Sequence, residues 1–415
     1  MSGSVRDWGA FQLHHGDNLA VLRGMPDNSV DSIVCDPPYG LTQGKKGGTG
    51  VASVNLESPY GRARIGTGNG PGGFMGLKWD YDVPPIEAWA ECLRVLKPGG
   101  HLLAFAGTRT QHRMAVRIED AGFEIRDMIC WVYGSGFPKS LDVSTAIDKA
   151  AGAERETVGL GPKLKSMAGM AYGSDRSERE AVALVLTAPA TPEAAQWDGW
   201  GTALKPALEP ITVARKPLIG TVAANVLAHG VGGLNIEASR VAGESTVRVQ
   251  GTAEIGFHGG NFAPGLETGS ALGRWPANLI HDGSPDVLAA FPNVKTGKGG
   301  GAGVGFAGGD RDTGSAARFF YCPKASKADR QPGNTHPTVK PTELMRYLIA
   351  LVTPPGGVTL DPWMGSGSTG KAAVAAGFRF IGIDADPGHF LVAERRIAHA
   401  YIPGSMGDPS TWAAA

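Results

Sequence analysis

Short apolar runs alternate with helix-like segments at both ends of this 415-residue chain. Near the start, strands are expected at 11–17, 30–35 and 101–107, with helices over 86–97 and 108–121. Near the end, helices over 342–352, 368–377 and 387–400 alternate with strands at 358–361 and 378–384. Strands and helices that alternate in this way form a parallel sheet with helices on both faces, so we predict a doubly wound α/β protein.

The middle of the chain interrupts this alternation. From 139 to 335 the sequence is rich in Gly, Ala and Pro, and only a helix near 140–152 and a strand within 205–218 stand out. We therefore divide the chain into a first core half (1–138), an insert (139–335), a second core half (336–403) and a tail (404–415). Within the insert, 205–218 is expected to return to the core sheet. The two core halves are expected to complete one sheet.

Composition indicates the cellular compartment more than it indicates the partner. The 39 basic and 39 acidic side chains balance, which neither favours nor excludes a nucleic acid. The four cysteines form no Cys-x-x-Cys pair, so we expect a reducing compartment and no metal. No stretch approaches the ~18 apolar residues of a membrane span, and the start lacks the apolar run of a signal peptide. A cytoplasmic protein without a membrane partner is expected.

Residues 358–373, VTLDPWMGSGSTGKAA, form a glycine-rich loop between a strand and a helix, where nucleotides often bind. Gly365, Gly367 and Gly370 give the G-x-G-x-x-G pattern of dinucleotide-binding proteins. The same letters match the start of an ATP-binding P-loop, although Ala372 stands where that loop needs Ser or Thr for Mg²⁺. S-adenosylmethionine is the third candidate. The loop alone does not decide among the three ligands.

The tetrad Asp36-Pro37-Pro38-Tyr39 directly follows the strand expected at 30–35, at the edge where open α/β sheets bind ligands. These residue types suit methylation of an amino group on an aromatic base, a nitrogen whose lone pair is delocalised into the ring. The Asp36 carboxylate and the Pro37 carbonyl would each accept one N–H and so aim the lone pair outward. The prolines fix that carbonyl and add no competing N–H, and Tyr39 offers a face on which a base can stack.

Four motifs occur in a defined order: D-P-P-Y at 36–39, H-P-T-V-K-P at 336–341, D-P-W-M-G-S-G-S-T-G at 361–370 and G-I-D-A-D-P at 382–387. Together they resemble the β class of DNA amino-methyltransferases of the adenine-N6 type, and the middle of the chain resembles solitary enzymes of prophages that have no partner nuclease. The likeness covers about 11–136 and 336–400. It implies a Rossmann-like, mostly parallel seven-stranded sheet of the S-adenosylmethionine-dependent methyltransferase type, with an irregular target-recognition insert.

The resemblance also implies roles for single residues. The first core half becomes the catalytic half, with Asp36, Pro37, Pro38 and Tyr39 as the catalytic residues. In the cofactor half, Asp361 is expected near the methionine ammonium and Asp384 on the ribose hydroxyls. Asp17 matches the position that meets the adenine amino group of the cofactor. The expected cofactor-binding residues are Asp17, Lys340, Pro341, Asp361, Pro362, Gly365, Ser366, Gly367, Thr369 and Asp384.

The implied reaction is methyl transfer from S-adenosylmethionine to the exocyclic N6 of adenine, at a specific site in double-stranded DNA, after the base has been flipped out. Three alternatives stay open. Methylation of cytosine N4 suits the same geometry, but such enzymes more often begin the tetrad with Ser. Methylation of a protein glutamine uses a related tetrad that commonly begins with Asn. A silent DNA-binding regulator would not need an intact tetrad beside an intact cofactor loop.

Contacts to DNA are expected from basic side chains outside the motifs. The glycine-rich segment 40–78 carries Lys45, Lys46, Arg62 and Arg64, which are placed to meet phosphates if the segment closes over DNA. Arg274 in the insert is a further candidate. Because relatives of the β class are often dimers, a homodimer is expected. No fused nuclease is expected, since the chain offers no room for one.

Overall fold

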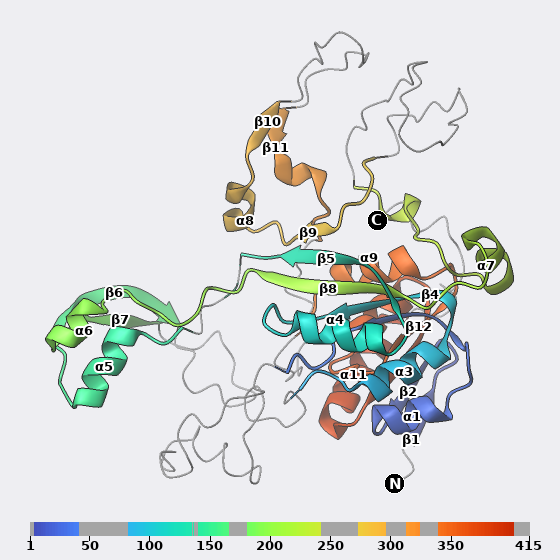
Figure 1. The fold of residues 1–415 in the computed structure, drawn as a ribbon, viewed down its shortest axis with the longest axis horizontal. Helices are drawn as coiled ribbons and strands as arrows, with labels where there is room; N and C mark the ends of the chain where they lie inside the picture. Colours follow the sequence, from blue (N-terminus) through green and yellow to red (C-terminus); the bar gives the residue numbers. More distant parts are fainter. Residues whose placement is uncertain are drawn as a thin grey trace. The chain divides into compact units, whose positions relative to one another are not determined.

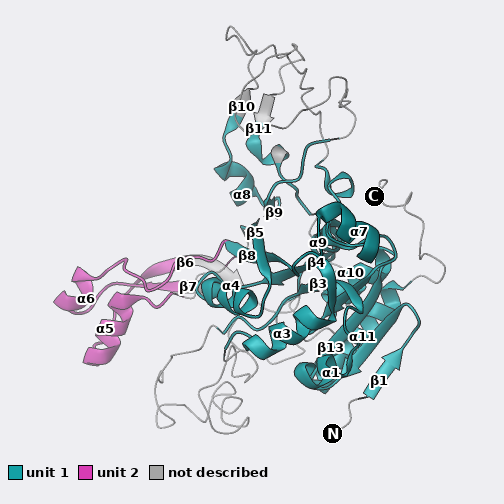
Figure 2. Ribbon diagram, turned by 45° about the vertical axis from the view of Figure 1, so that its right-hand side comes forward, with its two compact units in different colours: residues 1–41, 82–134, 208–415 teal, residues 42–81, 135–207 magenta. Residues whose placement is uncertain are grey.

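The computed structural model describes residues 4–40, 82–134, 136, 140–165, 181–241, 273–295, 313–323 and 339–401. The chain divides into two compact units, drawn in different colours in Figure 2. Unit 1 comprises 1–41, 82–134 and 208–415, and unit 2 comprises 42–81 and 135–207.

The described residues of unit 1 form a mixed sheet of nine strands. Their order is β1 (Ser4–Asp7), β2 (Phe11–His15), β13 (Arg379–Asp384), β12 (Val358–Asp361), β3 (Val30–Cys35), β4 (Leu96–Phe105), β8 (Leu208–Arg215), β5 (Glu124–Val132) and β9 (Leu279–His281). The five strands from β2 to β4 in this order run parallel, whereas β8 is antiparallel to both β4 and β5. The predicted α/β class with a mostly parallel sheet is confirmed.

The predicted strand number was wrong, because the described residues already contribute nine strands to the sheet instead of seven. The two additional strands lie at the edges: β1 pairs antiparallel with β2, and β9 pairs parallel with β5. β1 has only one apolar residue, Val5, among its four exposed residues, and β9 has only three residues within a Gly- and Pro-rich region. Neither strand therefore shows the apolar periodicity from which strands are predicted.

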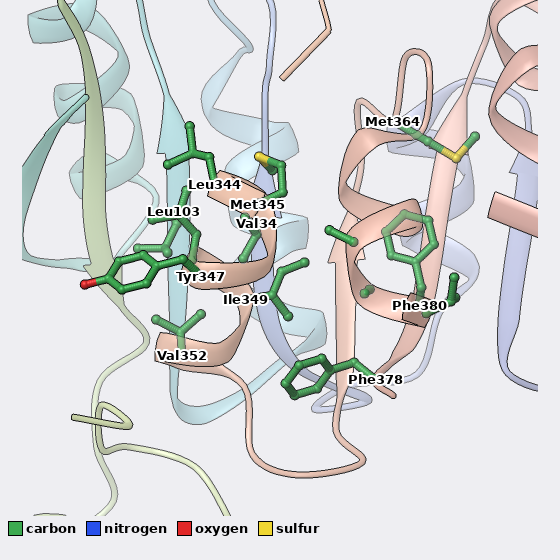
Figure 3. Packing of buried hydrophobic residues seen from close by; sticks show 14 of the residues in the cluster. Val34, Leu103, Leu344, Met345, Tyr347, Ile349, Val352, Met364, Phe378 and Phe380 are labelled. Carbon is green, nitrogen blue, oxygen red and sulfur yellow. The ribbon is translucent and has the colours of Figure 1, made fainter. Parts of the chain in front are cut away.

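Helices cover both faces of the sheet (Figure 1). On one face lie α9 (Thr342–Val352), α10 (Ser368–Ala375) and α11 (Pro387–Ala400), and on the other lie α1 (Asn18–Gly24), α3 (Ile86–Val95) and α4 (Gln111–Asp120). Successive strand residues point to opposite faces. Val34 and Leu103 therefore enter the core under α9 and α10 (Figure 3), while Ile33 and Leu102 enter the other core.

Unit 1 also contains short elements from the expected insert. They are α7 (Val222–His229), η5 (Glu237–Ser239), α8 (Pro285–Ala290), η7 (Ala316–Phe319) and the antiparallel pair of β10 (Asn293–Lys295) and β11 (Thr313–Ser315). Asn225 in α7 is fully buried, and its amide donates to the carbonyls of Pro98 and Val231 at 2.8 Å each. This bond to Pro98 attaches α7 to β4, so part of the insert packs on the core.

Unit 2 contains α5 (Val143–Ala151), the antiparallel pair of β6 (Thr157–Lys165) and β7 (Ala181–Thr187), and α6 (Pro192–Gln196). The buried carboxylate of Asp148 joins these elements. It accepts hydrogen bonds from Arg155 at 2.7 Å and from the Thr191 hydroxyl at 2.8 Å. In the described part of the chain, no helix is long and apolar enough to cross a membrane.

Close packing around Gly370 predicts a stability effect. A Cβ at Gly370 would lie 2.5 Å from Ile397 Cδ1 and 2.5 Å from Phe380 Cε1. Gly370→Ala is therefore expected to lower the free energy of unfolding by about 1–3 kcal/mol, measured by urea denaturation. Gly24→Ala is the control, since a Cβ there meets nothing within 4 Å. Equal stability of the wild type and Gly370→Ala would contradict this account.

Candidate active site

Four carboxylates lie at one edge of the sheet of unit 1. The strands β2, β13, β12 and β3 are neighbours and run parallel, so their carboxyl ends share this edge. Asp384 and Asp361 are the last residues of β13 and β12, and Asp36 directly follows β3. Asp17 lies two residues beyond β2, where it begins α1. The sequence thus brings one acid to the end of each strand, where α/β sheets bind ligands.

The loop after β12 is bound to its own strand through Asp361. The Thr369 hydroxyl donates to Asp361 Oδ2 at 2.6 Å, and the backbone N–H of Trp363 donates to Oδ1 at 3.0 Å. Asp361 is almost completely buried. Burial raises the pKa of Asp361 to about 7, although both hydrogen bonds act to lower it. The carboxyl therefore titrates near neutral pH.

The same loop is also bound to β13. The backbone N–H of Gly365 donates to Asp384 Oδ2 at 2.7 Å. Gly365 has φ 54° and Gly367 has φ 76°, both in the left-handed region that glycine adopts without strain. A Cβ at Gly367 would lie 2.9 Å from Ala393 Cβ, so this position also needs glycine for its close approach to α11. The two glycines therefore let the backbone turn tightly between two carboxylates.

The catalytic candidates Asp36 and Tyr39 hydrogen-bond to each other and to Lys340. The Tyr39 hydroxyl donates to Asp36 Oδ1 at 2.7 Å, and Lys340 Nζ donates to Asp36 Oδ2 at 2.7 Å. Lys340 Nζ also lies 3.0 Å from Tyr39 Oη and 4.8 Å from the centroid of the Phe105 ring. The sequence predicted all three residues for the site, but the direct pair of Lys340 with Asp36 was not predicted.

Glu209 completes this cluster, and it was missed by the sequence analysis. Its Oε2 lies 3.0 Å from Tyr39 Oη and 3.1 Å from Lys340 Nζ. Burial acts to lower the pKa of Lys340, but Asp36 and Glu209 outweigh it and raise that pKa. Glu209 reaches the site because β8 is antiparallel, which puts the start of β8 at the same edge as the carboxyl ends of its neighbours. An acid at the start of a strand expected to return to the sheet was the available signal.

The family model described as DNA methylase matches residues 30–149 and 310–395, which include Asp36, Tyr39, Lys340 and the glycine-rich loop. The chain belongs to the N6/N4 DNA methylase family. It is therefore a DNA methyltransferase. Both N6-adenine and N4-cytosine enzymes fall within this family.

Its relatives are distant. The Type II methyltransferase M.HindIII of Haemophilus influenzae is 22% identical over 93% of this chain and 94% of its own. The DNA adenine methyltransferase YhdJ of Escherichia coli is 40% identical over 62 residues, which is 15% of this chain and 21% of YhdJ. The solved structure of the cytosine-N4-specific PvuII DNA methyltransferase is 13% identical over 94% of this chain and 86% of its own, with a TM-score of 0.44.

The remaining predicted residues of this DNA methylase lie as follows. Asp17 caps α1, because its carboxylate accepts from the backbone N–H of Ala20 at 2.9 Å. Pro341 directly precedes α9, and Pro362 is buried after β12. Ser366 is buried, and its hydroxyl accepts from Arg396 at 2.9 Å. Lys45, Lys46, Arg62 and Arg64 lie outside the described residues.

Arg274 is half-buried, and its guanidinium donates to the backbone carbonyl of Arg318 at 3.2 Å. Its backbone pairs with that of Val241, and Arg240 lies over the ring of the neighbouring Trp275 at 5.7 Å. Among the described residues, no group of three or more His, Cys, Asp or Glu side chains is arranged to hold a metal ion.

The raised pKa of Asp361 predicts a pH-dependent stability. Between about pH 4 and 7 the native protein keeps a proton on Asp361 that the unfolded chain has released, so stability falls as pH rises through this window. The stability of the wild type minus that of Asp361→Asn is expected to decrease from pH 4 to 7 and to level off above. Urea denaturation of both proteins at four pH values measures it. A difference independent of pH would contradict the raised pKa.

Proposed function

We propose that this DNA methylase transfers a methyl group from S-adenosylmethionine to the exocyclic N6 of an adenine flipped out of double-stranded DNA. The observation that carries the proposal is the position of Asp36. It directly follows β3, and β3 is the neighbour of β12, the strand that leads into the loop 361–367. An acceptor for an amino group and a loop for the methyl donor are thus neighbours at one sheet edge.

The charges at this edge fit S-adenosylmethionine better than the other two nucleotides. The four carboxylates at the ends of β2, β13, β12 and β3 would repel the phosphates of a dinucleotide or of ATP. S-adenosylmethionine instead brings an ammonium, a sulfonium and ribose hydroxyls. In the proposal, Asp361 holds the ammonium, Asp384 the ribose hydroxyls and Asp17 the adenine. When bound, the cofactor supplies a methyl group that is electrophilic because sulfur carries a positive charge.

The tetrad supplies acceptors for the target amino group. Asp36 and the Pro37 carbonyl each take one N–H, which draws the nitrogen toward tetrahedral geometry and aims its lone pair at the methyl group. Tyr39 supplies the ring on which the flipped base stacks, an interaction of about 1–3 kcal/mol. Lys340 forms an ion pair with Asp36 at 2.7 Å, which holds the carboxylate of Asp36 in place as an acceptor.

Adenine is favoured over cytosine by the first residue of the tetrad. Asp36 stands where N4-cytosine enzymes more often carry Ser. The short stretch of 40% identity with the DNA adenine methyltransferase YhdJ supports the same choice. In the complete proposal, the insert 139–335 reads the target sequence, and Lys45, Lys46, Arg62, Arg64 and Arg274 contact DNA. The enzyme acts as a homodimer.

Nucleoside analysis tests the base directly. The purified protein is incubated with unmethylated DNA and S-adenosylmethionine, and the DNA is digested to nucleosides for mass spectrometry. N6-methyladenine is the expected product, and methylation-sensitive sequencing then finds the site. N4-methylcytosine would overturn the choice of base but not the reaction class. Absence of both, with cofactor binding shown by calorimetry, would overturn the proposal.

Asp36→Asn tests the acceptor role. The amide keeps the size of the side chain but removes the negative charge, so transfer is expected to fall at least ~100-fold, as when one oriented polar group is removed from an active site. Cofactor affinity should change little, because Glu209 still neutralises Lys340 at 3.1 Å. Radiolabelled methyl transfer and calorimetry measure the two effects. Turnover near the wild-type rate would exclude the acceptor role.

A further inference from the structure

The Tyr39 hydroxyl has two carboxylate neighbours but only one proton to donate. Tyr39 Oη lies 2.7 Å from Asp36 Oδ1 and 3.0 Å from Glu209 Oε2. A hydroxyl donates one hydrogen bond and accepts others, so it donates to either carboxylate, not to both at once. The row from Asp36 through Tyr39 to Glu209 therefore has room for one additional proton.

Lys340 fixes this row of oxygens. Its ammonium has three N–H donors, and three oxygens lie within reach: Asp36 Oδ2 at 2.7 Å, Tyr39 Oη at 3.0 Å and Glu209 Oε2 at 3.1 Å. Two carboxylates and one ammonium leave the cluster one negative charge in excess. A single proton therefore neutralises it. The hydroxyl of Tyr133 also hydrogen-bonds to Glu209.

We propose that Glu209 is the final acceptor of the proton that leaves the methylated amino group, and that the Tyr39 hydroxyl relays it from Asp36. This inference rests on the proposed methyl transfer. The nitrogen lone pair forms the N–C bond, and the pair of the broken C–S bond stays on sulfur. As the N–C bond forms, the nitrogen loses its surplus proton to Asp36, so the rate of transfer depends on where this proton goes. Asp36 protonates Tyr39 Oη as the Tyr39 proton moves to Glu209 Oε2, so Asp36 is an anion again and Glu209 is neutral.

The exposure of the two carboxylates explains why the proton on Asp36 needs a route through Tyr39 to Glu209. The side chains of Asp36 and Glu209 are 25% and 20% exposed. A base whose amino group rests on Asp36 covers the exposed part of Asp36, so water no longer reaches this carboxylate. Tyr39 is partly exposed, but burial and the neighbouring Asp36 and Glu209 charges raise its pKa, so it stays a hydroxyl and transmits a proton without ionising. Glu209, the second residue of β8, then releases the proton to solvent after the product leaves.

Two variants interrupt the relay at different atoms. Glu209→Gln keeps the size of the acceptor but cannot take a proton, and Tyr39→Phe keeps the stacking ring but removes the relay oxygen. Each is expected to slow single-turnover methyl transfer about 100-fold, the lower range for general acid–base catalysis. Because both act on one route, the double variant is expected to be no slower than the slower single variant. Glu91→Gln, which alters a carboxylate paired with Arg94 on α3, is the control and keeps the wild-type rate.

Base flipping is measured separately from chemistry. A duplex with 2-aminopurine at the target position gains fluorescence when the base leaves the stack, without any methyl transfer. The wild type is expected to show a solvent isotope effect on transfer in D₂O, and Glu209→Gln is expected to keep the fluorescence gain but lose this isotope effect. A transfer rate of Glu209→Gln equal to wild type, rate losses that multiply in the double variant, or loss of flipping would each overturn the relay. Failure of the wild type itself to methylate would instead overturn the proposed function.

Discussion

The ion pair between Lys340 and Asp36 is the interaction on which the site depends. The two residues are 304 positions apart in the chain, and the pair joins the turn after β3 to the segment that precedes α9. A buried ammonium is costly unless its charge and its N–H groups are all satisfied. Asp36, Tyr39 and Glu209 satisfy this one together. The tetrad therefore reaches its working arrangement only when the second half of the chain has packed on the first.

The other acids at this edge are placed at an energetic cost. Asp361 is buried near Asp36 and Asp384, and its raised pKa shows that the site disfavours its charge. The Trp363 N–H and the Thr369 hydroxyl offset part of this cost at Asp361, and the N–H of Gly365, whose φ of 54° suits glycine, does the same at Asp384. A ligand that brings positive charge would relieve the remainder. Carboxyl groups whose charged form is disfavoured in this way, so that their pKa is shifted, are typical of functional sites.

The sequence predicted those parts of the fold and site that depend on local pattern. Alternating apolar runs marked the parallel core, and the tetrad and the loop marked two of its strand ends. The edge strands β1 and β9 were not predicted, because β1 has a single apolar residue, Val5, and β9 has only three residues. Glu209 was not predicted for a different reason. Its role depends on the direction in which β8 crosses the sheet, and direction is a property of the whole topology that no local pattern encodes.

The antiparallel strand β8 gives this edge a kind of residue that a purely parallel sheet cannot supply. Parallel neighbours bring only their carboxyl ends to the edge, whereas β8 brings its amino end, and with it Glu209. Only β4 separates β3 from β8, so Asp36 and Glu209 stand on strands roughly 9–10 Å apart. Lys340, above the Phe105 ring at the end of β4, bridges this distance together with Tyr39. The antiparallel strand thus separates Asp36, which orients the target amino group, from Glu209, which can hold its proton. Lys340 contacts both carboxylates and keeps them in position.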